Sequence, residues 1–341
     1  MSVAEEVAAI RSSAGLSRPD HVAMVHVGGA NALELLQRAC TQSPYIREGR
    51  VRHALLLRED ASVLAEVLVV KVEDAFLVLA EGLDEAALVA WLDAAKRAGE
   101  DAVVRPTSSE WALLGVDGPY AWEVIAGLVG PVVLGLPYLA LLRKGDVVVL
   151  RAGKTGEYGY FLLVPRASLA ETEARLAEIG RPLDLAPVGL EALDVCALES
   201  WHFSIRALGG SYARLTPVEL QLQWRVAHGR EFIGSDALRA IRAEGTRPRL
   251  TCFVATGPTS PGERVTLGEL DVGEVFAACA SPTLGQTVGA ALLARRFAHP
   301  HLSLTAGKVA LRTCTASLVL NKSLTVQPHK DAYATRHEVP A

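Results

Sequence analysis

One carboxylate interrupts an apolar segment early in the chain. Residues 63–70 read Val-Leu-Ala-Glu-Val-Leu-Val-Val, so Glu66 stands alone among aliphatic side chains. Burial of an unpaired carboxylate costs free energy and raises its pKa, and a raised pKa suits proton transfer near neutral pH. Glu66 is therefore a catalytic candidate, either as a proton relay or as a charge that stabilises a cationic carbon. The alternative is that strand alternation points Glu66 to solvent.

Two further segments combine polar side chains with glycines or an aromatic ring. Residues 153–160 read Gly-Lys-Thr-Gly-Glu-Tyr-Gly-Tyr and present Lys154 and Tyr158 from a glycine-rich loop. Trp224 is followed by Arg225, His228 and Arg230. Arginine binds carboxylates in bidentate fashion, so this basic group is either a site for an anionic ligand or a solvent-facing turn.

Glu81 and His21 lie beside predicted strands. Glu81 follows the apolar segment 76–80 and precedes a predicted helix. An acid in this place either pairs with an amine-bearing substrate or starts the helix, whose N-terminus favours acids. His21 precedes the first predicted strand, and a single histidine there is either functional or structural.

The composition excludes several classes of protein. The chain has 341 residues, half of them hydrophobic, and a net charge of −4. This charge does not favour a nucleic-acid partner, and no apolar run reaches the roughly 20 residues of a membrane-spanning helix. The acidic N-terminus does not resemble a signal peptide, so we expect a cytoplasmic protein. The five cysteines are widely spaced, which argues against a zinc site or a disulfide framework and for free thiols.

The hydrophobic pattern predicts the elements that carry these residues. Helices are expected at 3–14, 30–40 and 83–98, from apolar residues at helical spacing. Strands are expected at 22–27, 54–57, 63–72, 76–80 and 111–116, followed after residue 245 by strands at 250–254, 272–278, 287–293 and 308–315. The succession favours an α+β fold that ends in a small barrel-like domain.

Several segments together, in the same order, resemble the glycine-cleavage T-protein (aminomethyltransferase) superfamily. The loop at 153–160 is similar to the family's Gly-Tyr-Thr-Gly-Glu-Asp-Gly-Tyr, and 115–121 to its Gly-Pro-x-Ala turn. Leu198-Glu199 followed by Thr-Pro-Val-Glu at 216–219 resembles Arg-Leu-Glu-Ala-Gly followed by Thr-Pro-x-Glu. Ser-Pro-Thr-Leu-Gly at 281–285 resembles the late Ser-Pro-x-Leu-Gly.

This resemblance implies a fold and a division into domains. We expect a three-domain α+β cloverleaf with a central folate channel and a β-barrel-like C-terminal domain. The first domain would be discontinuous, formed by residues 1–50 and 141–245. The second would be an insertion at 51–140, and the third would cover 246–341.

The resemblance also implies roles for single residues. Glu199 matches the glutamate that holds the pterin, where one carboxylate accepts two adjacent N–H groups. Lys154, Tyr158, Trp224, Arg225 and Arg230 are expected to contact folate as well. His21 matches the histidine of the family's Ser-His-Met and joins Glu66 as a catalytic candidate. Glu81 and His202 are expected on the substrate side, where His202 is alternatively a structural histidine, and no metal is expected.

The function implied is a tetrahydrofolate-dependent transfer of a methyl, methylene or aminomethyl group. The partner would be a small-molecule donor or acceptor, with no nucleic acid and no membrane. Glu66 stands where the family has Asp, Leu79-Ala80-Glu81 where it has Val-Asn-Ala, and Lys154 where it has Tyr. These departures argue against glycine cleavage, make a lipoyl carrier protein an unexpected partner, and favour a divergent branch that acts on another one-carbon donor or acceptor. A demethylase-like direction is favoured because folate is then a diffusible acceptor. The alternatives are a non-catalytic folate-binding protein of the iron–sulfur assembly type and a glycine-cleavage aminomethyltransferase.

Overall fold

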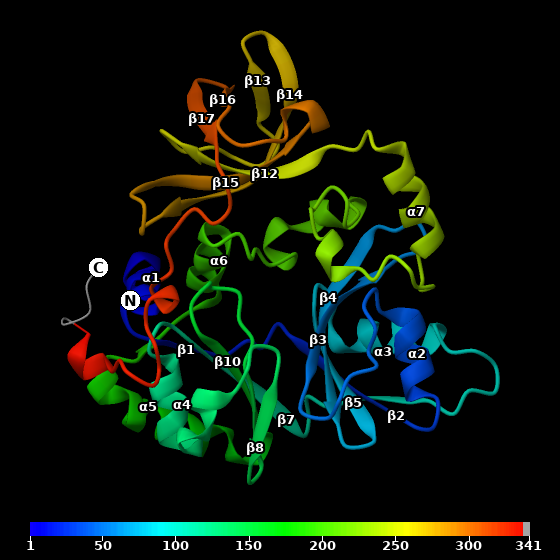
Figure 1. Ribbon diagram of the computed structural model, residues 1–341, viewed down its shortest axis with the longest axis vertical. Helices are drawn as coiled ribbons and strands as arrows, with labels where there is room; N and C mark the ends of the chain where they lie inside the picture. Colours follow the sequence, from blue (N-terminus) through cyan, green and yellow to red (C-terminus); the bar gives the residue numbers. More distant parts are fainter. Residues whose placement is uncertain (337–341) are drawn as a thin grey trace.

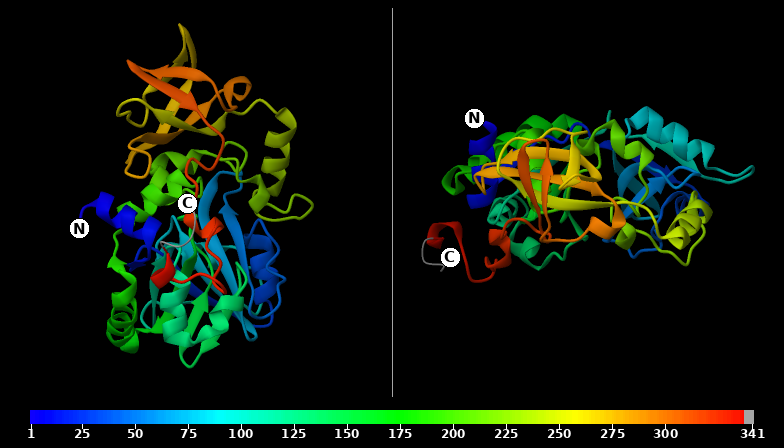
Figure 2. Two further views of the ribbon diagram at one scale, coloured as in Figure 1. Left: turned by 60° about the vertical axis from the view of Figure 1, so that its left-hand side comes forward. Right: turned by 90° about the horizontal axis from the view of Figure 1, so that it is seen from above.

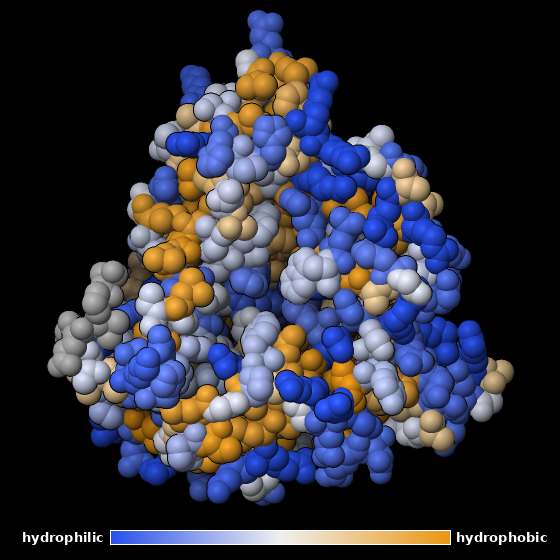
Figure 3. Space-filling model, in the orientation of Figure 1, coloured by the Kyte–Doolittle hydropathy of each residue, from blue (hydrophilic) through white to orange (hydrophobic). Residues whose placement is uncertain are grey.

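The computed structural model describes residues 1–336 and shows three lobes around a central helical segment (Figure 1). In the same view its surface is mostly polar, with scattered apolar patches (Figure 3). The first lobe is built on a sheet with the order β11-β1-β7-β10-β9-β8. Its strands are β1 (Gly15–Ser17), β7 (Trp111–Asp117), β8 (Leu141–Lys144), β9 (Val147–Leu150), β10 (Gly159–Pro165) and β11 (Ala186–Pro187). Helices α4 (Ala121–Val129) and α5 (Leu169–Gly180) pack on it through a core that includes Leu114, Ile125 and Leu176.

The second lobe carries Glu66. Its sheet has the order β3-β4-β5-β2-β6. The strands are β2 (Ala23–Gly28), β3 (Val51–Leu57), β4 (Val63–Val72), β5 (Ala75–Glu81) and β6 (Val103–Pro106). Helices α2 (Ala32–Ala39) and α3 (Glu85–Ala94) cover one face through Leu35, Leu88 and Leu92. The predicted helices and strands of this lobe are present, with bounds shifted by a few residues.

The third lobe is a closed barrel with the order β12-β15-β14-β13-β16-β17. Its strands are β12 (Arg249–Ala255), β13 (Arg264–Leu267), β14 (Leu270–Ser281), β15 (Gln286–Leu293), β16 (Ser303–Ala306) and β17 (Val309–Thr313). The predicted C-terminal barrel is confirmed. Because a closed barrel pairs every strand on both sides, it leaves no free sheet edge.

Between the lobes lie α1 (Val3–Ser12), α6 (Leu190–Glu199), α7 (Ser235–Glu244) and the irregular segment 200–230. Phe203, Leu220 and Phe232 of this central region share one core with Leu57 of β3 and Phe276 of the barrel. After β17 the chain returns to the first lobe (Figure 2), where the amides of Lys322 and Ser323 donate to Glu157. The middle of the molecule is therefore tied to the second lobe and the barrel, and the C-terminal segment is tied to the first lobe.

Two strands belong to a different sheet from the one that the predicted domain bounds imply: β2, from residues 1–50, and β7, from residues 51–140. β2 pairs with β5 and β6, so it belongs to the sheet that contains most of residues 51–140. β7 pairs with β1 and β10, so it belongs to the sheet of residues 141–165. Met24, Leu79, Leu113 and Leu150 form a common core between the two sheets, which explains how neighbouring strands of the chain enter different sheets.

Among residues 1–336, no helix has both the length and the apolar character needed to cross a membrane.

Candidate active site at the junction of the lobes

Glu66 is the centre of a buried polar cluster. It lies on β4, between β3 and β5, and its side chain is 3% exposed. One carboxylate oxygen lies 2.5 Å from His53 Nε2 and 2.5 Å from Arg225 Nη1. The other accepts a hydrogen bond of 2.9 Å from Lys154 Nζ. The interpretation that strand alternation turns Glu66 to solvent is therefore wrong.

Lys154 bridges two carboxylates. Glu66 of β4 and Glu81 of β5 are directly opposite each other in the sheet register. Like charges in this position repel and destabilise a strand pair. Lys154 Nζ lies 2.9 Å from Glu66 and 2.9 Å from Glu81, and it reaches them from the glycine-rich loop at 153–158. The first lobe thus supplies the cation that allows the second lobe to hold two acids side by side.

These contacts decide the charge of each group. Burial alone would raise the pKa of Glu66, but Arg225, Lys154 and His53 outweigh it and hold the pKa well below its usual value. The pKa of Glu81 is also lowered, because Lys154 and Ser204 overcome burial and the repulsion from Glu66. Burial and Arg225 lower the pKa of His53, so it is neutral at neutral pH. The predicted raised pKa of Glu66 is therefore wrong.

Two adjoining cavities open on this cluster. We call the first the Glu66 cavity, and it is lined by His53, Glu66, Glu81, Tyr138 and Lys154 together with apolar side chains. The second, the His21 cavity, is lined by His21, Glu81, Asp117, Lys154, Asp194 and Arg206, among others. Glu81 and Lys154 are the charged residues of the wall that the two cavities share, which also includes Val22, Gly153 and Phe161. Burial lowers the pKa of His21, which favours its neutral form.

Aromatic and cationic groups flank the Glu66 cavity. Trp224 is 60% exposed, meets His53 edge to face with centroids 6.0 Å apart, and has the Arg225 guanidinium 4.5 Å above its ring. Tyr138, 54% exposed, lines the same cavity. Arg225 Nε is buried and has no hydrogen-bond partner among residues 1–336. Ring surfaces for stacking and an unpaired guanidinium donor fit a folate, which carries aromatic rings and carboxylates.

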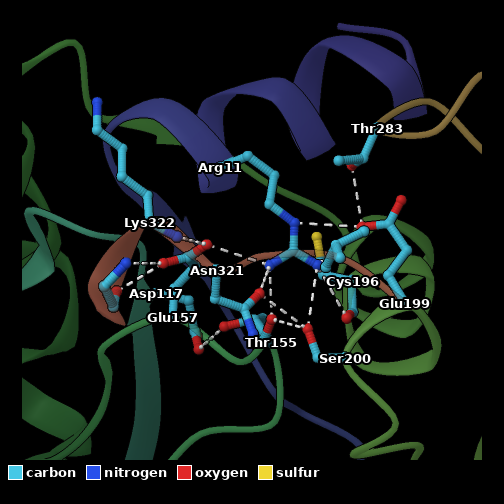
Figure 4. Close-up of polar contacts among 12 residues, drawn as sticks. Arg11, Asp117, Thr155, Glu157, Cys196, Glu199, Ser200, Thr283, Asn321 and Lys322 are labelled. Atoms are coloured by element: carbon cyan, nitrogen blue, oxygen red, sulfur yellow. Dashed lines mark hydrogen bonds and ion pairs between the residues drawn. The ribbon is translucent and has the colours of Figure 1, made fainter. Parts of the chain in front are cut away.

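Glu199 lies in a separate cluster around Arg11 (Figure 4). Its carboxylate is fully buried and accepts from Arg11, at 2.8 Å from Nη2, from Ser281 at 2.6 Å and from Thr283 at 3.0 Å. Arg11 also donates to the backbone oxygen of Thr155 at 2.7 Å. A ligand would have to displace these donors, so the expected pterin contact of Glu199 stays a prediction.

Three other predicted residues lie apart from the Glu66 cluster. The Tyr158 hydroxyl donates to the backbone oxygen of Val326, and Arg151 lies over its ring. Arg230 donates to the backbone oxygens of Gln37 and Cys40 at the C-terminal end of α2. His202 is exposed, and its backbone N–H closes the end of α6 on Ala197. Their contacts in this structure are structural, and their roles toward folate or substrate remain untested predictions.

Sequence reasoning missed His53, Tyr138 and the Asp194–Arg206 pair. Arg206 Nη2 contacts both carboxylate oxygens of Asp194, at 2.5 and 2.6 Å, on the wall of the His21 cavity. No spacing in the chain marks these residues, because each reaches the site through a different element. Only His53 could have been found from a predicted strand pairing. Leu55 of β3 is opposite Glu66 of β4, and His53, two residues before Leu55, points to the same face of the sheet.

The three-lobed fold is shared with a solved structure. The crystal structure of glycine cleavage system aminomethyltransferase T from Bartonella henselae superposes with a TM-score of 0.80 at 22% identity, over 94% of this chain and 90% of that one. At this identity the match defines the fold. The class is thus an α+β cloverleaf of the T-protein type, as predicted.

Sequence comparisons identify the family. The model of the GCVT N-terminal domain matches residues 1–230. An aminomethyltransferase of Streptomyces coelicolor is 33% identical over 310 residues, which cover 87% of this chain and 82% of the relative. One from Corynebacterium aurimucosum is 29% identical over 303 residues, 85% of this chain and 81% of the relative. The chain belongs to the GCVT family of glycine-cleavage T-proteins, and the prediction of an enzyme of this family is confirmed.

Proposed function

We propose that the protein transfers a one-carbon group from a small donor to tetrahydrofolate at the Glu66 and His21 cavities. The observation that carries this proposal is the pair of ionised carboxylates that lie opposite each other in the sheet: Glu66 lines the Glu66 cavity, and Glu81 lines both cavities. Membership of the GCVT family and the names of the curated relatives support the same reaction class.

Glu66 and Glu81 act as fixed negative charges in this proposal. Both have lowered pKa values, so neither carries a proton near neutral pH. A carbon that leaves its donor develops positive charge, and preorganised carboxylates stabilise that charge without reorganisation. Lys154 holds the two carboxylates in place and keeps them from repelling each other. The cluster therefore favours charge stabilisation over the proton relay as the role of Glu66.

Tetrahydrofolate supplies the nucleophilic nitrogen that accepts the carbon when it is bound. The side chains that would hold it in this chain are Trp224 and Tyr138, through their rings, and Arg225, through its unpaired Nε–H. Tyr138 lines the Glu66 cavity, while Trp224 and Arg225 contact its lining residues His53 and Glu66, which leaves the His21 cavity for the donor. The wall that carries Glu81 and Lys154 then lies between donor and acceptor.

Two donor classes compete for the His21 cavity. An aminomethyl donor agrees with the names of the relatives, all aminomethyltransferases. A neutral methyl donor, and hence a demethylase-like reaction, agrees with Lys154, whose ammonium already occupies the space between the two carboxylates. A free amine on the donor would compete with Lys154 for the same oxygens.

Mass spectrometry of the folate tests the proposal. The protein is incubated with tetrahydrofolate and, in separate reactions, with aminomethyl and methyl donors. We expect a one-carbon-loaded folate with one donor class. Folate that remains unmodified with both classes, or calorimetry that detects no tetrahydrofolate binding, would overturn the proposal.

A variant pair locates the reaction at Glu66. Glu66→Gln removes the charge and keeps the shape, and we expect turnover to fall by about 10²–10³-fold. The matched control is Glu73→Gln, on the exposed turn that follows β4, where the carboxylate contacts Arg143 at 3.2 Å. The control should keep its turnover. Equal turnover in the two variants, with folding confirmed by circular dichroism, would remove Glu66 from the site.

A further inference from the structure

Asp117 is a buried acid at the end of β7 that the proposed function does not use. It is 5% exposed and lines the His21 cavity. Among residues 1–336 its recorded side-chain donor is Thr155, whose hydroxyl lies 3.1 Å from Oδ1. Glycines make room for the carboxylate: a Cβ at Gly153 or Gly159 would lie 2.9 or 2.8 Å from Oδ1. The chain thus holds a carboxyl group at the cavity with little to neutralise it.

Arg11, the cation that acts on Asp117, is already shared by two other acids (Figure 4). Arg11 Nη2 lies 2.8 Å from Glu199, and Nη1 lies 3.4 Å from Glu157. Asp117 is the third carboxylate around this one guanidinium, and no ion pair between Arg11 and Asp117 is formed. Burial, with a contribution from Glu157, outweighs Thr155 and Arg11 and raises the pKa of Asp117 to about 7.

The groups that face Asp117 across the cavity are committed to other partners. Lys154 is bound to Glu66 and Glu81, and Arg206 is bound to Asp194. His21 is held neutral by burial. Cys196 does not line the cavity but contacts Arg11 through its backbone oxygen, and burial raises the pKa of its thiol to about 12. Glu66 and Glu81 stay ionised. Asp194 also lines the His21 cavity and burial raises its pKa, but both of its carboxylate oxygens contact Arg206. Asp117 has no such cationic contact among residues 1–336, so of the acids on this wall it is the one placed to give and regain a proton near neutral pH.

We infer that Asp117 is the general acid of the site, which protonates the donor heteroatom as the carbon leaves it. This inference rests on the proposed function. The bond between carbon and the donor heteroatom breaks, and the heteroatom keeps the electron pair and takes the Asp117 proton. The carbon forms its new bond to the acceptor nitrogen, whose proton is released to water. Asp117 regains a proton from solvent, so charge and protons balance over the cycle.

The test compares Asp117→Asn with Thr155→Val in the full chain. Asp117→Asn keeps the shape and neutrality of the protonated acid but cannot transfer its proton, so kcat should fall by about 10²–10³-fold. The fall of wild-type kcat with rising pH around 7 should disappear. Thr155→Val removes the hydroxyl donor that stabilises the ionised form, so the same fall should move to higher pH.

Two further readouts separate this inference from the proposed function. Calorimetry should give the same dissociation constant for tetrahydrofolate in wild type and Asp117→Asn. Infrared difference spectra, wild type minus Asp117→Asn, should show a protonated carboxyl that disappears as pH rises through about 7, whichever donor is used. Wild-type turnover with an unchanged pH profile in Asp117→Asn, or no such carboxyl signal, would overturn the inference. Failure of wild type to bind tetrahydrofolate would instead overturn the proposed function.

Discussion

Glu66 and Asp117 differ in charge although each is a buried acid on a strand. Glu66 has Arg225, Lys154 and His53 within hydrogen-bond distance, and these partners keep it ionised. Asp117 has only the Thr155 hydroxyl as a side-chain donor among residues 1–336, and burial keeps its carboxyl protonated up to about pH 7. The difference assigns them different tasks: a fixed charge at Glu66 and an exchangeable proton at Asp117.

The raised pKa of Asp117 predicts how stability changes with pH. The pKa of Asp117 in the folded protein, about 7, lies above the ordinary value of 3.8. The contribution of its protonated carboxyl to the free energy of unfolding is therefore complete below about pH 3.8 and is lost as pH rises through 7. Asp117→Asn cannot ionise, so it should gain on wild type by roughly 2–4 kcal/mol between pH 4 and pH 8. Urea unfolding at a series of pH values measures this difference. Asp146→Asn, at an exposed turn, is the control and should show a flat difference.

At the scale of elements, the loop at 153–158 positions Lys154. Thr155 is held by Arg11 through its backbone oxygen, and Glu157 is held by the amides of Lys322 and Ser323. Gly156 has a φ of 82°, a backbone conformation that favours glycine. The loop is therefore fixed on both sides of its turn, which brings Lys154 between Glu66 and Glu81.

Gly156→Ala should displace this loop. A Cβ there would lie 2.4 Å from Asn321 Nδ2 and 2.4 Å from Ser200 Oγ, so we expect a loss of roughly 2–4 kcal/mol in the free energy of unfolding. Turnover should fall with it, because Lys154 moves. The control is Gly145→Ala at the β8–β9 turn, with a φ of 58° and no atom within 4 Å of the new Cβ. It should lose about 1 kcal/mol. If both variants lose the same free energy of unfolding, the neighbours of Gly156 must shift to accommodate the added methyl group, and the expectation would be wrong.

At the scale of the whole molecule, Arg11 joins parts of the chain that lie far apart in sequence. It contacts the loop at 153–158, α6 through Glu199, and the C-terminal segment through Asn321 at 2.9 Å. Glu199 in turn binds Ser281 and Thr283 beside the barrel. This buried cluster links the barrel to the first lobe, and the relative position of the lobes sets the shape of both cavities.

Removal of one partner from this cluster should destabilise the assembly of lobes. Glu199→Ala leaves the Arg11 guanidinium buried without its main partner, and we expect a loss of about 3–5 kcal/mol. Thermal unfolding measures the loss, and the double variant with Arg11→Met should recover part of it. A variant of wild-type stability that binds tetrahydrofolate more weakly would contradict this view. It would support instead the pterin contact that the family resemblance implies.

The sequence by itself determined the family, the kinds of element and the barrel, because these depend on local periodicity and on short motifs, each contained within one segment of the chain. It also singled out Glu66, Glu81 and Lys154. Their charges followed only from tertiary structure, because the partners that set them lie far away in the chain: Arg225 is 159 residues from Glu66, and Lys154 is 88 residues from it. The exchange of β2 and β7 between sheets was decided in the same way, by a core that both sheets share. Burial and ion pairing depend on which distant groups meet, and no pattern within one segment contains that information.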